Sequence, residues 1–278
     1  MPDSLTREWN LAKPEALEIS GRFIVQGSGE TGTLLDKSGW QGTGSAVEFS
    51  DMVKTLLSVL LALSCMASAP AALVSYWNFN GLSVATASAP GAGGVPLSIS
   101  ADQGSGTLSL SAWGGLVDDF AGSATNAIAP DVAEESLSLV SGGPAAGPFP
   151  GNGSFLDLSF SLTGFENPVV TFAGRGTATG FNTGSWSWST DGINFNPIAG
   201  NTATVSTTFA LLTQDFSSAD GLDQAASVTL RYTLTGATSN SGNNRIDNLQ
   251  INASPVPEPS SSVAMLTGLA LLGWRRRR

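Results

Sequence analysis

The feature that most constrains the fold is a strict alternation of apolar and polar residues in three separate segments. In residues 155–162 (FLDLSFSL) the apolar side chains at even positions alternate with Asp or Ser, and residues 228–235 (VTLRYTLT) and 248–253 (NLQINA) show the same period. Successive side chains of a β-strand point to opposite faces. These segments therefore predict half-buried strands, with Asn248 and its alternate neighbours on the solvent side.

Six weaker strand candidates lie around these three. They are residues 74–79, 97–101, 107–112, 169–174, 185–189 and 204–212. The whole set predicts about nine strands, and pairs such as Asn80-Gly81 and Asp220-Gly221 supply tight turns between them. We therefore predict an all-β fold, an antiparallel β-sandwich of jelly-roll-like type. A single helical turn is expected at Asp131–Ser136, where Asp131 has Glu134 at the capping-box position.

The region of these strands, residues 73–254, is acidic and almost free of cations. It contains 13 Asp and Glu residues against Arg175, Arg231 and Arg245, so its net charge is 3 minus 13, or −10, with no Lys or His. Nucleic-acid binding needs several clustered cations, so we expect no nucleic-acid partner. The lack of His, and of Cys other than Cys65, excludes Ser-His-Asp and Cys-His nucleophiles and the usual zinc sites.

Catalysis in this region would have to depend on carboxylates, because two acids about 5–9 Å apart can hydrolyse a glycosidic bond. The candidates are Asp118-Asp119, Glu134-Glu135, Asp157 and Asp191. Adjacent acids on a strand point to opposite faces and seldom act together. We therefore expect no catalytic residue and no enzyme, and keep a carboxylate-dependent glycoside hydrolase as a second alternative.

Asp247 is the one candidate metal ligand. It has the parity of the apolar residues that follow it, so we expect its side chain to point inward. Its partner would be Arg245, the backbone amides of residues 239–244, or a calcium ion held together with oxygens of Asp102 or Asn78. Calcium suits oxygen ligands, but no EF-hand spacing occurs. Structural hydrogen bonding without a cofactor is favoured, and calcium is the weaker alternative.

Trp186 and Trp188 are two residues apart and therefore share one face of a strand. Ser185, Ser187 and Ser189 take the solvent face, which favours burial of both indoles in the core. The alternative is an exposed aromatic platform that stacks on sugar rings. Residues 73–254 would then be a carbohydrate-binding module for extracellular polysaccharide.

The carboxyl end combines three consecutive elements. Val256-Pro257-Glu258-Pro259 precedes a short Ser run, residues 263–274 are apolar, and Arg275, Arg276, Arg277 and Arg278 follow. A helix of the apolar residues would be roughly 18 Å long against a bilayer core of about 30 Å, which predicts a short hydrophobic helix with transient membrane insertion. The Arg cluster would stay on the cytoplasmic side and leave the domain outside.

Pro257, Glu258 and Pro259, the apolar segment and the terminal Arg run resemble the PEP-CTERM sorting signal. The resemblance implies an exported bacterial protein whose tail is recognised and processed by an exosortase-type membrane peptidase, in a cell with an extracellular polysaccharide matrix. Residues 186–195 and 244–249 are also similar to the jelly-roll-like domains of many PEP-CTERM proteins, to whose motifs no activity is attached.

An export signal is predicted at residues 52–72. Met52-Val53-Lys54 is a positively charged start, Thr55–Leu63 is an apolar core, and Ala67-Ser68-Ala69 suits cleavage by signal peptidase. Cys65 lies inside this signal helix, and acylation there as a lipoprotein is a weaker alternative because the preceding residues make a poor lipobox. Residues 1–51 hold eight carboxylates against four basic residues, so we expect them to be disordered or not translated.

The predicted organisation is thus an unstructured or untranslated segment (1–51), a signal peptide (52–72), a β-sandwich (73–254) and a sorting signal (255–278). We expect a protein of the cell envelope, outer surface or extracellular matrix of a bacterium, with a non-catalytic structural or adhesive role. Carbohydrate binding is the alternative function.

Overall fold

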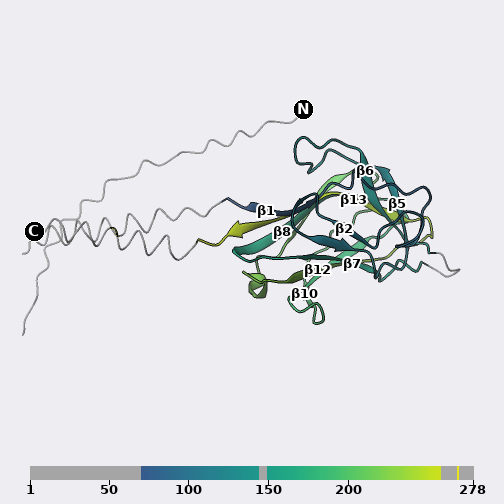
Figure 1. The fold of residues 1–278 in the computed structure, drawn as a ribbon. Helices are drawn as coiled ribbons and strands as arrows, with labels where there is room; N and C mark the ends of the chain where they lie inside the picture. The colour runs from purple at the N-terminus through teal and green to yellow at the C-terminus, as the bar shows by residue number, and fades with distance from the viewer. Residues whose placement is uncertain (1–69, 144–148, 258–267, 269–278) are drawn as a thin grey trace, which may run out of the picture. The chain divides into compact units, whose positions relative to one another are not determined.

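The computed structural model describes residues 70–143, 149–257 and 268 of the chain. In the first two ranges, thirteen strands and one 3-10 turn (Asp220–Leu222) form two antiparallel sheets that face each other (Figure 1). The predicted all-β sandwich is therefore confirmed. The predicted signal helix lies outside the described residues, and so does the predicted C-terminal helix apart from Gly268, which is helical.

The first sheet has seven strands. Its main path is β11 (Ala210–Asp215), β8 (Phe165–Gly176), β13 (Asn243–Pro255), β1 (Ala72–Trp77) and β3 (Gln103–Gly104). β6 (Glu135–Val140) pairs with one end of β13, and β5 (Leu116–Ala121) pairs with β6. β13 holds this sheet together because it pairs with β1, β6 and β8.

The second sheet has six strands. Their order is β10 (Asn196–Ile198), β9 (Thr183–Ser189), β12 (Val228–Thr235), β7 (Phe155–Phe160), β4 (Thr107–Ser109) and β2 (Ser98–Ser100). Its centre is the predicted pair of alternating segments, since β12 pairs with β7 from Val228 opposite Phe160 to Thr233 opposite Phe155.

The core lies between the inner faces of the two sheets. Trp186 stacks on Tyr232 with ring centroids 4.5 Å apart and meets the edge of Phe216 at 6.0 Å. Trp77 donates its indole N–H to the Ile99 carbonyl at 3.0 Å, which joins β1 of one sheet to β2 of the other. Full burial of a large apolar side chain contributes about 1.5–3 kcal/mol, so these aromatics account for much of the cohesion of the sandwich.

Several elements differ from the sequence-based expectation. The helical turn expected at Asp131–Ser136 is absent, because Glu135 already begins β6. The strand expected at 204–212 occupies Ala210–Asp215 instead, and β3, β5, β6 and β10 were not predicted. β6 escaped detection because Ser136 and Ser138 are as buried as the alternating Leu137 and Leu139. Its outer face is covered, so its polar residues do not mark solvent.

Candidate functional site

Hydroxyl side chains cover the outer face of the second sheet. On each strand they alternate with residues whose side chains are buried in the core, as a period of two requires. We call this surface the polar face. Its residues are Ser98, Ser100, Thr107, Ser109, Asp157, Ser159, Ser185, Ser187, Thr229, Arg231 and Thr233.

The strand register aligns these side chains in rows that run across the sheet. One row passes from Ser98 to Ser109, Asp157, Arg231 and Ser187, each the Cα partner of the next. A second row runs through Thr107, Ser159 and Thr229 on the same strands. Neighbouring strands are about 4.8 Å apart, so each row offers polar groups at a regular interval.

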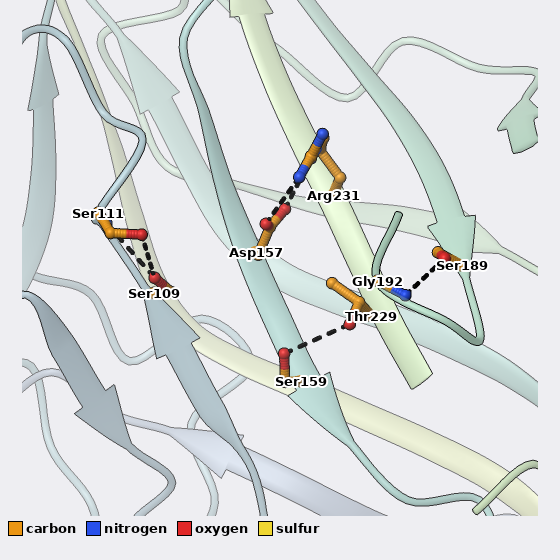
Figure 2. Close-up of polar contacts among 8 residues, drawn as sticks. All are labelled: Ser109, Ser111, Asp157, Ser159, Ser189, Gly192, Thr229 and Arg231. Atoms are coloured by element: carbon orange, nitrogen blue, oxygen red, sulfur yellow. Dashed lines mark hydrogen bonds and ion pairs between the residues drawn. The ribbon is translucent and has the colours of Figure 1, made fainter. Parts of the chain in front are cut away.

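An ion pair occupies the centre of the polar face (Figure 2). Arg231 on β12 donates from Nε to Asp157 Oδ1 at 2.8 Å and from a terminal nitrogen to Oδ2 at 2.9 Å. The two side chains are 25% and 22% exposed, so solvent still reaches them. Such a two-pronged contact is the strongest geometry for an arginine and a carboxylate, and it fixes both groups in place.

Two aromatic rings enclose the guanidinium group of Arg231. Its central carbon lies 3.6 Å from the ring centroid of Phe155 and 3.7 Å from that of Phe195. Phe155 comes from β7, whereas Phe195 comes from the loop between β9 and β10. The polar face therefore combines a planar cation, a carboxylate and two aromatic rings within one partly exposed cluster.

Pairs of hydroxyl groups extend the polar face on either side of this cluster (Figure 2). Ser159 and Thr229 approach to 3.5 Å between their oxygens, and Ser109 lies 2.9 Å from Ser111. Each hydroxyl can donate one hydrogen bond and accept two, so these groups keep unused capacity toward solvent.

The β9–β10 turn positions Phe195. Ser189 Oγ accepts from the amide of Gly192 at 3.0 Å, and Asp191 Oδ1 accepts from the amides of Ile193 and Asn194 at 2.8 Å each. The pKa of Asp191 lies well below its usual range, mainly because of the hydrogen bonds that Asn194 donates to its carboxylate. Asp191 is therefore an organiser of this turn.

A cleft of about 300 Å³ opens beside β2 and is continuous with the polar face, because Ser98 and Ser100 line both. Asn78 and Asp102 form part of its wall. The Asp102 carboxylate accepts from the Asn78 amide at 2.8 Å, and the Asn78 side chain donates to Asp131 at 3.2 Å. No hydrogen bond joins these groups to Asp247 among the described residues, and a calcium ion held by them stays a prediction.

Asp247 is buried, but outside the sandwich core. The register of β13 shifts between Asp247 and Gln250, and Asn248 adopts a φ of 49°. This bulge changes the parity, so that Ile246 and Leu249 both enter the core while Asp247 and Asn248 point away from it. The expectation that Asp247 shares the inward face of the following residues is therefore wrong, and so is the solvent position expected for Asn248, which is 1% exposed.

A loop covers these two residues, and we call residues 122–131 the strap. The Ser123 amide donates to Asp247 Oδ2 at 2.5 Å, and the Asn248 side-chain amide donates to the carbonyls of Ser123 and Thr125. The Tyr76 hydroxyl donates to Asn248 Oδ1 at 2.7 Å. Burial is the main cause that raises the pKa of Asp247 to about 7.

Arg245, one of the partners considered for Asp247, forms no ion pair with it. Its guanidinium carbon lies 4.2 Å from the ring centroid of Phe120, and the one ion pair among the described residues joins Arg231 to Asp157. Within the same ranges, no three His, Cys, Asp or Glu side chains gather where they could hold a metal ion.

The two tryptophans lie on the inner side of β9. Trp186 is 2% exposed and donates its indole N–H to Thr202 Oγ1 at 2.7 Å, while Trp188 is partly buried and packs against the core. An exposed platform of both indoles is therefore not present. Ser189, expected on the solvent face, is also buried, because its hydroxyl organises the following turn.

The carboxylate pairs considered for catalysis do not converge. Asp118 and Asp119 are consecutive on β5, and Asp119 accepts from the Val84 amide at 3.0 Å. Asp157 is paired with Arg231, and Asp191 accepts hydrogen bonds within its own turn.

The sequence did not reveal the cluster around Arg231. The strand register that joins Arg231 to Asp157 and the loop that brings Phe195 over Arg231 are properties of the folded chain.

Of the residues named for the predicted sorting signal, the structure describes Pro257, whereas Glu258, Pro259 and Arg275–Arg278 lie outside the described residues. Among the residues that are described, no helix has the length and apolar character needed to cross a membrane.

Comparison with solved structures gives low similarity. The CBM22-1 xylan-binding domain of Xyn10C from Paenibacillus barcinonensis is 13% identical, with a TM-score of 0.36 and coverage of 69% of this chain and 100% of that one. TmCBM61 in complex with beta-1,4-galactotriose is 10% identical, with a TM-score of 0.31 and coverage of 49% and 80%. The K3 cleaved adhesin domain of Lys-gingipain from Porphyromonas gingivalis W83 is 11% identical, with a TM-score of 0.31 and coverage of 66% and 98%. No function is transferred at these values.

No curated protein sequence matches the chain. A family model for the PEP-CTERM protein-sorting motif matches residues 255–278, the same residues that the sequence pattern singled out. The chain therefore carries a PEP-CTERM protein-sorting motif at residues 255–278, immediately after a domain built as a β-sandwich.

Proposed function

We propose that this is an exported, non-catalytic protein of the bacterial cell surface whose β-sandwich binds extracellular polysaccharide through the polar face. The observation that carries the proposal is the cluster of Arg231, Asp157, Phe155 and Phe195 at the centre of rows of hydroxyl side chains. The sorting motif supports export and processing by an exosortase-type peptidase.

The chemistry of the polar face suits a sugar chain. Sugar hydroxyls both donate and accept hydrogen bonds, and the face offers a carboxylate that accepts, a guanidinium group that donates and hydroxyls that do both. Phe155 and Phe195 are both partly exposed, so part of each ring can contact the C–H groups of a sugar ring. Because the face is open and continues into the cleft beside β2, it fits an extended polymer better than a single enclosed sugar.

The positions of the acids support a non-catalytic role. Glycoside hydrolysis requires two carboxyl groups on either side of one bond. Asp157 is the only acid among the residues of the polar face, and both of its carboxylate oxygens accept hydrogen bonds from Arg231.

A structural or adhesive role without sugar binding is the second candidate. This role is favoured because Asp157 and Arg231 already form hydrogen bonds and an ion pair with each other, so neither charged group needs a ligand. The two candidates differ in one property, which is saturable binding of a glycan to this face.

Affinity electrophoresis of the full chain in gels that contain neutral matrix polysaccharide of the native host tests the proposal. We expect Arg231→Ala and Asp157→Ala each to weaken retardation roughly tenfold, since each removes a charge-assisted contact and frees the other side chain. Arg175→Ala is the matched control, because it removes the same charge from the other sheet. Unchanged retardation in the folded Arg231→Ala, Asp157→Ala double variant would reject the polar face as the binding surface.

A further inference from the structure

Two of the three arginines of the domain lie side by side on the outer face of the first sheet. Arg175 on β8 and Arg245 on β13 are direct Cα partners, and both alternate with residues that face the core. Like charges directly opposite each other on a sheet destabilise it. The two arginines are nonetheless adjacent, although the domain has 13 acids and a net charge of −10. Among the described residues, no acid lies within ion-pair distance of either arginine.

Aromatic rings orient these two cations in place of carboxylates. The guanidinium carbon of Arg245 lies 4.2 Å from the ring centroid of Phe120, and that of Arg175 lies 5.7 Å from the ring centroid of Phe209. A ring that contacts the flat side of a guanidinium group leaves its in-plane N–H donors free for an acceptor. The two arginines therefore present unused donors at one place.

Two buried polar atoms at this place also have no partner within the described part of the chain. They are Nε of Arg245 and Oγ of Ser138, whose residues face each other across β13 and β6. Ser138 is 0% exposed. Burial is the main cause of the lowered pKa of Arg245. The neighbouring charge of Arg175 adds to this shift, and the charge of Asp118, which is the Cα partner of Ser138, opposes it. An anion that bridges the two arginines would offset the repulsion between their like charges.

We propose that Arg175 and Arg245 bind an anionic group carried by a sugar chain, either a carboxylate or a sulfate. A planar guanidinium group holds both kinds of oxyanion through paired N–H donors. Phe120, which is 39% exposed, lies beside the site and borders it with an apolar surface. The site is on the opposite sheet from the polar face and does not depend on the function proposed for that face.

Affinity electrophoresis of the full chain with polygalacturonate, dextran sulfate and neutral dextran tests this site. The net charge of −10 repels polyanions, so retardation by either of them requires a local cationic site, and Arg275–Arg278 would form a second one. Every variant is therefore made in a chain in which these four arginines are replaced by Gln. We expect one or both polyanions to retard the protein at low salt, and Arg175→Gln and Arg245→Gln each to weaken this roughly tenfold or more. The polyanion that retards the protein shows whether the site binds a carboxylate or a sulfate.

Gln224→Glu is the matched control, because it makes the net charge more negative by one, as each Arg→Gln variant does, at an exposed position outside both proposed sites, and it should leave polyanion binding unchanged. The melting temperature of each variant shows whether it is folded. If Arg245→Gln unfolds, Arg175→Gln, at a half-exposed position, is sufficient to test the site. The proposal is overturned if neither polyanion retards the protein, or if folded Arg175→Gln binds as well as the parent chain.

Discussion

Raising the pH from 5 to 8 should destabilise the fold through a single buried carboxyl group. Asp247 is 1% exposed, and burial raises its pKa from 3.8 to about 7 despite the hydrogen bonds from the amides of Ser123 and Asn248. The folded protein therefore keeps a proton that the unfolded chain releases above about pH 4. The free energy of unfolding must fall as the pH rises between these two values, and the loss is complete once the pH exceeds the folded pKa.

The size of this effect follows from the difference between the two pKa values. About 3 units at about 1.4 kcal/mol each give an upper limit of about 4 kcal/mol between pH 4 and 7. The chain contains no His, so no imidazole titrates in this window. Burial raises the pKa of Asp118 as well, which acts in the same direction, whereas the lowered pKa of Asp191 affects stability only below about pH 4, where stability falls with falling pH.

Urea denaturation at pH 5, 6, 7 and 8 measures the effect. We expect the parent chain to lose up to about 1.4 kcal/mol per pH unit between pH 5 and 7, and Asp247→Asn to show a much smaller slope. Asp220→Asn, at an exposed carboxylate, is the matched control and should keep the slope of the parent chain. Stability that is constant or rises between pH 5 and 7, or a slope that survives in Asp247→Asn, would refute the assignment.

Four substitutions test the packing by urea denaturation. Trp186→Ala should cost about 3–5 kcal/mol because the indole is buried in the core, and Trp188→Ala, at a partly buried position, should cost clearly less; equal losses would contradict the placement of the two indoles. Asn248→Ala should cost about 1–3 kcal/mol and speed amide exchange in the strap, because it removes three side-chain hydrogen bonds; an unchanged strap would contradict the contacts described. Gly236→Ala should cost at least about 1 kcal/mol, since the φ of 85° is strained for Ala and its Cβ would collide with the Asn182 side chain, whereas a neutral effect would argue against this turn.

The alternation of apolar and polar residues was sufficient to predict the sandwich and its central strands. β7 and β12 have one face in the core and one in solvent, so the alternation in their sequences predicts both the strand and the side that is buried. The same rule failed where the outer face is covered. Ser138 is polar and fully buried, and the bulge at Asn248 changes which residues of β13 face the core.

The candidate sites were less predictable than the fold. Asp157 and Arg231 are 74 residues apart in sequence, and their contact depends on a strand register that no local pattern specifies. Phe195 reaches Arg231 only because the Asp191 turn directs the β9–β10 loop over the sheet. Trp186 and Trp188 were more obvious candidates for sugar binding than Arg231, but their side chains pack in or against the core.

The most direct test of polysaccharide binding by the polar face is an NMR titration of the full chain with neutral oligosaccharides from the matrix polysaccharide of its native host. We expect saturable shifts at the Arg231 Nε–H and at the backbone amides of β7 and β12, with the largest changes around Phe155 and Phe195. A titration with no saturable shift, or with shifts confined to the first sheet, would contradict the assignment of this face.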